Sequence, residues 1–332
     1  LIVPDRLLLN TQLKDLRQWL LDDTEIREIV SFDESVFDTA VVDSIIIIYQ
    51  TTKRRSDFIY AKYKASFDDL KKRVSTKIPV SYIKLSSSIQ FDLNYNPQKY
   101  QLLIKIWKRS IPLQDISDTK DGIIQSKIGD LLFLSSPINK ECKKMLVGEN
   151  IKKYMISYAN RYVDYRPDFM MEHENNRGGG GLRLRNKFIF ERPKILTRQT
   201  ADEIIAAFDD EDYYYANTLH GTSITDSTYN PHFVLGILNS KLTTWFYRSN
   251  TDEEGKVFAQ IKIELLRKLP IPKADESDQQ RIIEIVTRII ASKIENNRIN
   301  TTKDEQEIDK LVYELYGLTD EEINIIEKNV RK

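Results

Sequence analysis

Apolar residues recur along the chain at two spacings, first in short strand-like runs and later at helical intervals. Residues 1–3, 26–32 and 41–49 are apolar runs of strand length, and the third contains the unbroken series Ile45 to Ile48. A continuous β-branched run is typical of a strand that is covered on both faces of an α/β sheet. These runs predict three buried strands near the N-terminus.

An amphipathic helix is predicted between the first two strands. Leu13, Leu16 and Leu20 fall on one face of this helix, and Asn10 or Thr11 is placed to cap it. The order strand, helix, strand, strand is that of the end of a layered α/β domain. Because three strands do not make a two-sided sheet alone, we expect further strands before residue 1.

From Pro97 onward the pattern changes to α+β. Tyr100 to Arg109 predicts a helix, and the runs 202–208 and 213–219 predict two short strands paired through an acidic turn. A further helix is predicted from Pro231 to Tyr247.

Residues 276–332 are predicted to be helical. Asp278 is placed to cap one amphipathic helix, and Gly317 to end the next as a left-handed residue. Thr319 and Glu322 form the sequence pattern of a capping box before the last helix. Such helices normally pack on their own domain or on a partner, and these carry no catalytic motif.

The stretch from Arg177 to Thr200 is strongly basic and begins with four glycines, Gly178 to Gly181. Leu182 and Leu184 alternate with cations, which predicts a strand with one apolar and one cationic face. Guanidinium groups beside a glycine hairpin suit phosphates and base edges. A solvated edge strand whose charges prevent aggregation explains the pattern equally well.

A buried strand, Pro193 to Leu196, is predicted to hold this basic arm, with Lys194 and Arg198 exposed. We expect the hairpin at Gly178 to Gly181 to be ordered only when DNA is bound.

Two aromatic features permit more than one interpretation. Tyr154, Tyr158, Tyr162 and Tyr165 have a spacing that is typical of a helical or packing stripe, and less often of a base-stacking platform. Phe37 lies in a loop between two predicted strands, at the edge where α/β sheets bind ligands. Its other interpretation is a loop anchor on the core.

Composition narrows the functional classes of this 332-residue chain, which is 41% hydrophobic and 30% charged, as in soluble globular proteins. Its 50 Lys and Arg equal its 50 Asp and Glu, which argues against a sequence-blind polyanion binder. A specific DNA binder is still compatible with this balance if the cations cluster on one surface and acidic residues cover the other. The single cysteine, Cys142, fits a reducing cytoplasm, and no run reaches membrane-spanning length.

Motifs for metal or nucleotide chemistry do not occur in the sequence. The three histidines lie far apart and there is one cysteine, so we expect no metal site. Gly178 to Gly181 lack the spacing of a phosphate-binding or dinucleotide-binding loop. No cofactor is therefore expected on this chain.

Several segments follow one another in an order that matches a known family and extends over essentially the whole chain. They are Leu1–Arg6, Ile29–Phe32 with Val36–Phe37, Ile45–Tyr49, Ile123–Gln125, Leu146–Tyr154, Arg192–Thr200, Leu235–Ser240, Lys268–Pro272 and Leu311–Leu318. In these segments the chain resembles gamma-class, TaqI-like adenine DNA methyltransferases, including the fused type IIG restriction-modification enzymes.

The resemblance implies that the chain is the C-terminal part of a longer enzyme. In this family a Rossmann-like domain binds S-adenosylmethionine through an acidic-x-Gly-x-Gly motif and holds a flipped adenine with Asn-Pro-Pro-Tyr, and neither motif occurs here. The complete protein is then an adenine-specific DNA methyltransferase, with or without a fused endonuclease. This chain is expected to be inactive without its missing N-terminal catalytic portion. By position, Phe37 matches the aromatic residue that stacks on the flipped adenine.

The implied fold is an α/β remnant of a Rossmann-like methyltransferase sheet, an α+β target-recognition domain and a helical C-terminal region. The expected boundaries are 1–55 for the sheet, 56–89 for a connecting region, 90–275 for the target-recognition domain and 276–332 for the helices.

The implied function is recognition of double-stranded DNA in the cytoplasm. The residues that we assign to the DNA contact are Arg177, Arg183, Arg185, Lys187, Arg192, Lys194, Arg198 and Gln199. Two alternatives stay open: a non-catalytic specificity subunit of a type I-like system, and an unrelated α/β protein whose basic strand faces solvent.

Overall fold

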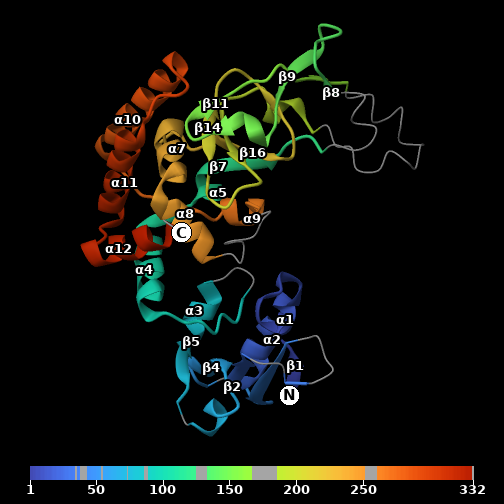
Figure 1. Cartoon of the computed structure of the whole chain (residues 1–332), viewed down its shortest axis with the longest axis vertical. Coiled ribbons are helices and arrows are strands. Elements are labelled where there is room, and N and C mark those ends of the chain that lie inside the picture. Colours follow the sequence, from blue (N-terminus) through green and yellow to red (C-terminus); the bar gives the residue numbers. More distant parts are fainter. Residues whose placement is uncertain are drawn as a thin grey trace, which may run out of the picture. The chain divides into compact units, whose positions relative to one another are not determined.

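The computed structural model describes the chain except for residues 34–35, 38–42, 54, 73, 86–88, 125–132, 167–184, 251–259 and 331–332. It divides into two compact units, Leu1–Leu102 and Leu103–Lys332 (Figure 1). Strands and helices occur in both, and the last three helices lie at the C-terminal end of the chain. The expected mixed α/β composition with a helical C-terminal region is confirmed.

A five-stranded sheet in the order β1-β3-β2-β4-β5 forms the centre of the first unit. Strand β2 is parallel to β4, and the other neighbouring pairs are antiparallel. The strands are β1 (Ile2–Pro4), β2 (Glu25–Phe32), β3 (Ser44–Gln50), β4 (Phe58–Ala65) and β5 (Thr76–Pro79). The helices are α1 (Arg6–Leu9), η1 (Thr11–Leu13), α2 (Lys14–Asp23), η2 (Asp69–Lys71) and α3 (Val80–Leu85), followed by α4 (Pro97–Lys108), which continues into the second unit.

The isoleucine run in β3 is buried on one face only among the described residues. Ile45 and Ile47 are buried, whereas Ile48 is half-exposed and Ile2 of β1, opposite Ile46, is also half-exposed. The prediction of a strand covered on both faces is therefore wrong for this structure. Strands β4 and β5 come from the expected connecting region, where a polar composition concealed the alternation of buried Ile59 and Ala61.

The predicted cap residue Asn10 caps the 3₁₀ turn η1, whereas α2 follows Leu13 without a side-chain cap and turns a different face to the core than expected. The Asn10 side chain accepts a hydrogen bond from Gln12 N, as a capping residue does. Leu16 is exposed, while Arg17 is buried beside Leu20. The Arg17 guanidinium is buried because it donates to the main-chain oxygens of Leu7, Asn10 and Ile89. The spacing of apolar residues does not predict a buried arginine with these main-chain hydrogen bonds.

Two four-stranded sheets form the β-structure of the second unit. The first is antiparallel, in the order β14-β13-β16-β7, and the second has the order β15-β9-β12-β8. Two further strand pairs are β17-β6 and β10-β11. The strands are β6 (Ser110–Pro112), β7 (Ser117–Asp121), β8 (Phe133–Leu134), β9 (Cys142–Leu146), β10 (Ile151–Lys152), β11 (Met155–Ile156), β12 (Tyr162–Asp164), β13 (Lys194–Arg198), β14 (Ala206–Asp209), β15 (Tyr214–Tyr215), β16 (Leu219–Ile224) and β17 (Pro270–Pro272). Short helical turns are α5 (Leu113–Ile116), η4 (Gly148–Asn150), η5 (Lys187–Ile189) and α9 (Ile263–Leu266).

Strand β13 is the predicted buried strand, and it is central in its sheet. Ile195 and Leu196 have no exposed surface, and the strand pairs with both β14 and β16. The strands expected at 202–208 and 213–219 do not pair with each other. Instead, β14 pairs with β13, and β15 pairs in parallel with β9 of the other sheet. The chain leaves one sheet for the other at the acidic turn, and Tyr213 to Tyr215 join the core between the sheets.

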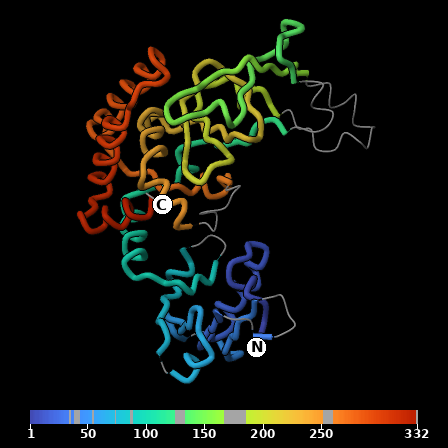
Figure 2. Tube along the Cα trace, in the orientation of Figure 1, coloured from blue at the N-terminus to red at the C-terminus, as the bar shows by residue number. Residues whose placement is uncertain are grey.

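The C-terminal helices cover the antiparallel sheet through α7 (Pro231–Asn239). Helix α7 packs against β14, and α10 (Glu276–Glu295) packs against α7. Figure 2 shows the trace of the C-terminal helices running beside α7. The other helices of this layer are α8 (Lys241–Ser249), α11 (Thr302–Tyr316) and α12 (Asp320–Val330). In the part of the chain that the structure describes, no helix has the length and apolarity needed to cross a membrane.

Helix boundaries agree with the sequence at the C-terminus and differ at two caps. Gly317 ends α11 with φ of 62°, and Thr319 and Glu322 exchange the two hydrogen bonds of a capping box. Helix α10 is capped by Asp275, three residues before the expected Asp278. The helix expected from Pro231 to Tyr247 is broken at Ser240, whose hydroxyl caps α8.

Candidate nucleic-acid interface

The described part of the basic stretch begins at Arg185. Arg177, Gly178 to Gly181 and Arg183 lie outside the described residues, so their strand, hairpin and DNA-contact assignments stay predictions. At Lys187 the chain forms the 3₁₀ turn η5, not the predicted strand.

Arg185 is held against the end of strand β7. Its Nε donates to the main-chain oxygen of Gly122 at 3.2 Å, and its Nη2 lies 4.0 Å from Asp121 Oδ2. The other Asp121 oxygen is 2.8 Å from Nδ1 of the buried His220. Tyr165 Oη donates to the Arg185 main-chain oxygen at 2.7 Å, and this residue has φ of 67°. These contacts fix the point at which the basic stretch joins the sheet.

Beyond Arg185 the turn η5 presents an exposed aromatic ring. Asn186 caps the turn by accepting a hydrogen bond from Phe188 N at 2.9 Å. The Phe188 ring is 63% exposed, and the guanidinium carbon of Arg192 lies 4.7 Å from its centroid. The neighbouring side chain of Lys187 is 68% exposed, and its amine is 3.9 Å from Glu191.

Asp118 on strand β7 holds two of the cations. Its carboxylate is 2.8 Å from Nη2 of Arg192 and 2.8 Å from Nζ of Lys120. Burial favours the neutral form of this carboxyl, but hydrogen bonds from Lys120 and Arg192 outweigh it and lower the pKa of Asp118 below its ordinary value. We refer to Asp118, Lys120, Asp121, Arg185, Lys187, Phe188 and Arg192 as the β7 cluster.

Lys194 is buried, so the prediction that it is exposed is wrong. Its ammonium lies 2.5 Å from Asp209 Oδ2 and donates to the main-chain oxygens of Phe190 and Arg192 at 2.6 and 3.3 Å. Asp209 also accepts from the main-chain N–H of Tyr213 at 3.2 Å. Burial lowers the pKa of Lys194 and raises that of Asp209, and the attraction between the two charges opposes both shifts. The Lys194 amine therefore holds the main chain at Phe190 and Arg192 and has no surface exposed for a contact with DNA.

Arg198 and Gln199 lie at the other end of β13 and are partly buried. The Nε of Arg198 is buried without a hydrogen-bond partner in the described structure. The main chain of Gln199 bonds to Thr218 and Ile261 at 2.9 and 2.6 Å. Their assignment as DNA contacts stays a prediction.

The tyrosines that follow Lys153 are buried or pack against other aromatic rings. The ring of Tyr158 contacts those of Tyr162 and Tyr213, and Tyr165 contacts Tyr214. Tyr154 is buried, and burial raises its pKa. These residues lie on the short strands β11 and β12 and the connections beside them, not on a helix, and their mutual contacts agree with the packing interpretation.

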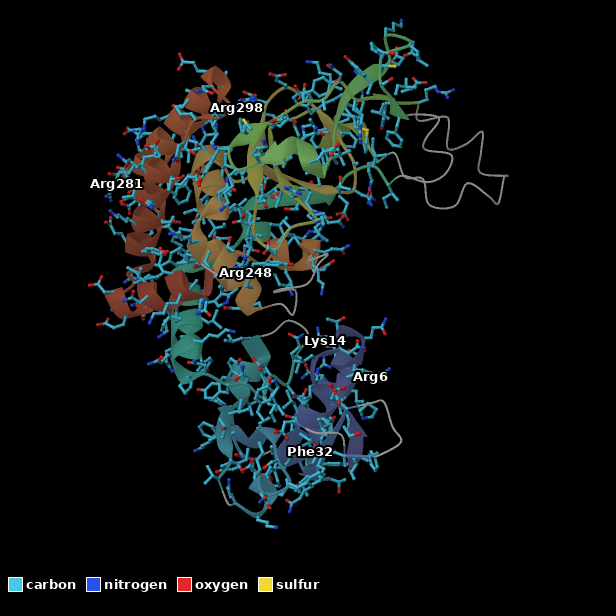
Figure 3. All side chains as sticks on the ribbon, viewed as in Figure 1. Arg6, Lys14, Phe32, Arg248, Arg281 and Arg298 are labelled. Carbon is cyan, nitrogen blue, oxygen red and sulfur yellow. The ribbon has the colours of Figure 1, made fainter. Side chains whose placement is uncertain are left out.

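Three members of the β7 cluster, Asp118, Asp121 and the exposed Phe188, are not among the residues predicted from the sequence. Asp118 and Lys120 lie two residues apart on β7 and therefore share one face of the strand, a spacing that could have indicated an exposed face. Arg267 adds a further cation, donating to the main-chain oxygen of Thr119 at 2.7 Å. Other arginines of this unit are engaged elsewhere: Arg248 bonds to Asp202, and Arg281 pairs with Glu314 on the outer side of α10 (Figure 3).

The β7 cluster has the chemistry of a binding surface. Cations fixed by carboxylates and an exposed ring suit phosphates and bases, and the cluster contains no arrangement of nucleophile and base. Residues 143–271 match the family described as the TaqI-like C-terminal specificity domain, and this range includes η5, β13 and the residues between them. This part of the second unit is therefore similar to the TaqI-like specificity domain. The resemblance seen in the sequence is confirmed.

Two longer proteins are similar to nearly the whole chain. A putative type II restriction enzyme and methyltransferase of Methanocaldococcus jannaschii, RM.MjaORFECS2P, is 27% identical over 333 residues, covering 95% of this chain and 27% of that protein. The chain thus spans about a quarter of the length of this curated relative. The type IIL restriction-modification enzyme MmeI, solved in complex with DNA, shares the fold with a TM-score of 0.50 at 12% identity, covering 99% of this chain and 49% of MmeI.

Proposed function

We propose that this chain recognises a specific sequence in duplex DNA, as the specificity part of a type II restriction-modification enzyme. The observation that carries the proposal is the match of residues 143–271 to the TaqI-like specificity domain. The β7 cluster supports it, because Arg185 and Arg192 pair with Asp121 and Asp118 of one strand in a chain without net charge.

The first unit then belongs to the methyltransferase portion of the complete enzyme, as a remnant of a Rossmann-like sheet. Phe37, which is 45% exposed, would be one side of the pocket for a flipped adenine. We expect S-adenosylmethionine to bind outside the first unit, because residues 1–102 contain no glycine with which a main-chain loop could approach the cofactor closely. In the complete enzyme, residues outside this sequence would bind the cofactor.

Selection from a pool of random-sequence duplexes tests DNA recognition by the 332-residue chain. We expect one short sequence to be enriched and bound on the order of a thousandfold more tightly than the unselected pool. Replacing Arg183 with Ala should weaken binding and reduce the salt dependence by about one phosphate contact. Equal affinity for every duplex, or for none, would show that the proposal is incorrect.

Methylation mapping with the complete protein tests the enzymatic part of the proposal separately. The expected product is N6-methyladenine within the sequence that the chain selects. DNA binding by the chain together with a complete protein that transfers no methyl group would instead support the non-catalytic, type I-like specificity subunit.

A further inference from the structure

Phe188 has an environment unlike that of the other rings described in the specificity domain. It lies at the tip of η5 with 63% of its surface exposed, whereas Phe190, two residues later, is fully buried in the core between the sheets. An exposed phenylalanine on a turn gains nothing from burial in the free protein. A contact made only on binding is one explanation, because aromatic residues are over-represented where one protein surface meets another molecule.

The ring is nevertheless held in place on one side. The Arg192 guanidinium lies 4.7 Å from the ring centroid, and the guanidinium itself is fixed by Asp118 at 2.8 Å. The Arg192 side chain is largely buried, so it cannot itself extend far from the surface. The guanidinium therefore supports one side of the ring, while most of the Phe188 surface stays exposed.

The main chain beneath the ring is fixed from both ends of the loop. Asn186 accepts a hydrogen bond from Phe188 N, and Lys194 donates to the main-chain oxygens of Phe190 and Arg192. Lys194 is anchored in turn by Asp209. A ring on such a loop loses little conformational freedom when it binds.

Two exposed lysines, one of them next to Phe188 in the sequence, belong to the same cluster. The amines of Lys187 and Lys120 are on flexible side chains that are 68% and 47% exposed. A flat apolar group in a cluster that also carries exposed ammonium groups matches a nucleic acid, in which bases and sugars alternate with phosphates. An apolar protein partner would not favour these charges.

We propose that Phe188 is the apolar contact of this specificity domain with duplex DNA, where its ring packs against the bases in a groove. Lys187 binds a neighbouring phosphate, and Arg192 is a positioning residue that holds the ring. This inference rests on the proposed function and goes beyond it by naming the residue and the type of contact.

Salt titration separates a ring contact from a phosphate contact. The probe is the duplex that the wild-type chain selects from a random-sequence pool. Because an apolar contact releases no counterions, Phe188→Ala should weaken binding about 5- to 150-fold without changing the slope of log affinity against log salt. Lys187→Ala should reduce that slope by about one.

Matched variants distinguish the ring from apolar volume and from folding. Phe188→Tyr should bind like the wild type, and Phe188→Leu should recover only part of the loss. Phe67, a half-exposed ring of the first unit, provides the control: Phe67→Ala should leave DNA affinity unchanged. Circular dichroism melting should give the same midpoint for Phe188→Ala and wild type, since an exposed ring contributes little to the core.

A double-mutant cycle tests the positioning role of Arg192. Arg192→Gln should weaken binding in the wild-type background and have little further effect in Phe188→Ala, because the guanidinium acts through the ring. Additive losses would remove Arg192 from this role.

Two results would overturn the inference, and they differ from failure of the proposed function. Wild-type affinity in Phe188→Ala, or an altered salt slope in that variant, means that the ring is not an apolar DNA contact although the chain binds DNA. If the wild-type chain binds no duplex, the proposed function itself fails.

Discussion

Lys194 illustrates how a single buried charge can serve a surface loop. Its ammonium has no exposed surface and contacts the Asp209 carboxylate and two main-chain oxygens. Such a pair adds little net stability compared with apolar residues of equal volume, but removing one member leaves the other charge buried without a partner. The pair therefore fixes the course of the loop that ends at Arg192.

Lys194→Met should destabilise the second unit by about 3–5 kcal/mol, because Asp209 loses its buried counter-charge. Urea unfolding followed by circular dichroism measures this change. Lys187→Met, in the same loop but exposed, is the control and should change stability by less than about 0.5 kcal/mol. Equal effects of the two substitutions would contradict the importance of the pair.

The stability of the folded protein should depend on pH through Asp118. Its pKa is lowered in the folded protein, so its contribution to stability is present above the ordinary carboxyl pKa of about 4 and is lost as the pH falls through the folded value. Asp118→Asn should therefore be less stable than the wild type at pH 7, and the difference should vanish in acid. Urea unfolding at a series of pH values checks this, and a difference that grows toward low pH would be the opposite of the expectation.

The residues of the β7 cluster were only partly predictable from the sequence. Arg185, Lys187 and Arg192 stood out because they lie close together in a basic stretch. Asp118 could not be recognised as their partner, since it lies 74 residues from Arg192 and is brought there by strand pairing. Lys194 was assigned to the surface because a lone lysine is usually exposed, and its buried partner Asp209 comes from the neighbouring strand.

At the scale of elements, the two sheets of the second unit meet where Tyr215 lies over Gly221 of β16. A Cβ atom at Gly221 would lie 2.2 Å from the Tyr215 hydroxyl and 2.5 Å from its ring. Tyr215 is fully buried, so the ring has no space to move aside. The absence of a side chain at Gly221 sets how closely β15 approaches the antiparallel sheet.

Gly221→Ala should destabilise the second unit by about 1–3 kcal/mol through overpacking. Gly148→Ala is a matched control, because a Cβ atom there would meet Thr218 at 3.4 Å. Thermal melting of the two variants beside the wild type provides the comparison. If both variants melt together with the wild type, the sheets tolerate a wider spacing than the structure indicates.

Elements with local signals were predicted best. The left-handed Gly317 and the capping box at Thr319 are set by residues within one turn of the helix, so sequence was sufficient. The pairing of β14 and β15 was not, because sheet partners are chosen by packing far along the chain. Arg17 changed the buried face of α2 for the same reason, since Ile89 O lies 72 residues away.

For the whole molecule, the C-terminal helices belong to the compact second unit rather than forming an appendage. A Cβ atom on Gly236 of α7 would lie 2.6 Å from Ile282 of α10, so these helices are in close contact. Ile282, Val286 and Ile289 of α10 are fully buried. The family resemblance predicts a helical C-terminal region. The extent to which α10 contributes to the core of the second unit is not evident from the sequence, because polar residues cover the outer face of the helix.

A chain of residues 103–332 should fold alone and melt cooperatively, whereas residues 103–275 should not. The shorter chain exposes the apolar surface of α7 that α10 covers. Circular dichroism melting and binding of a hydrophobic dye measure the two outcomes. A cooperative transition in the shorter chain, at the midpoint of the longer one, would contradict the structural role of the helices.

The main-chain attachment of the loop from Asn186 to Arg192 also bears on how a new DNA target could evolve. The hydrogen bonds that hold this loop go to the N–H of Phe188 and to the carbonyl oxygens of Phe190 and Arg192. These are main-chain atoms, so any residue except proline at position 188 can make the same bonds. Substitutions at Lys187 and Phe188 therefore change the side chains of the proposed DNA contact while the main-chain path of the loop is preserved. If the chain recognises DNA as proposed, this separation permits single substitutions to be tried by selection without loss of the folded structure.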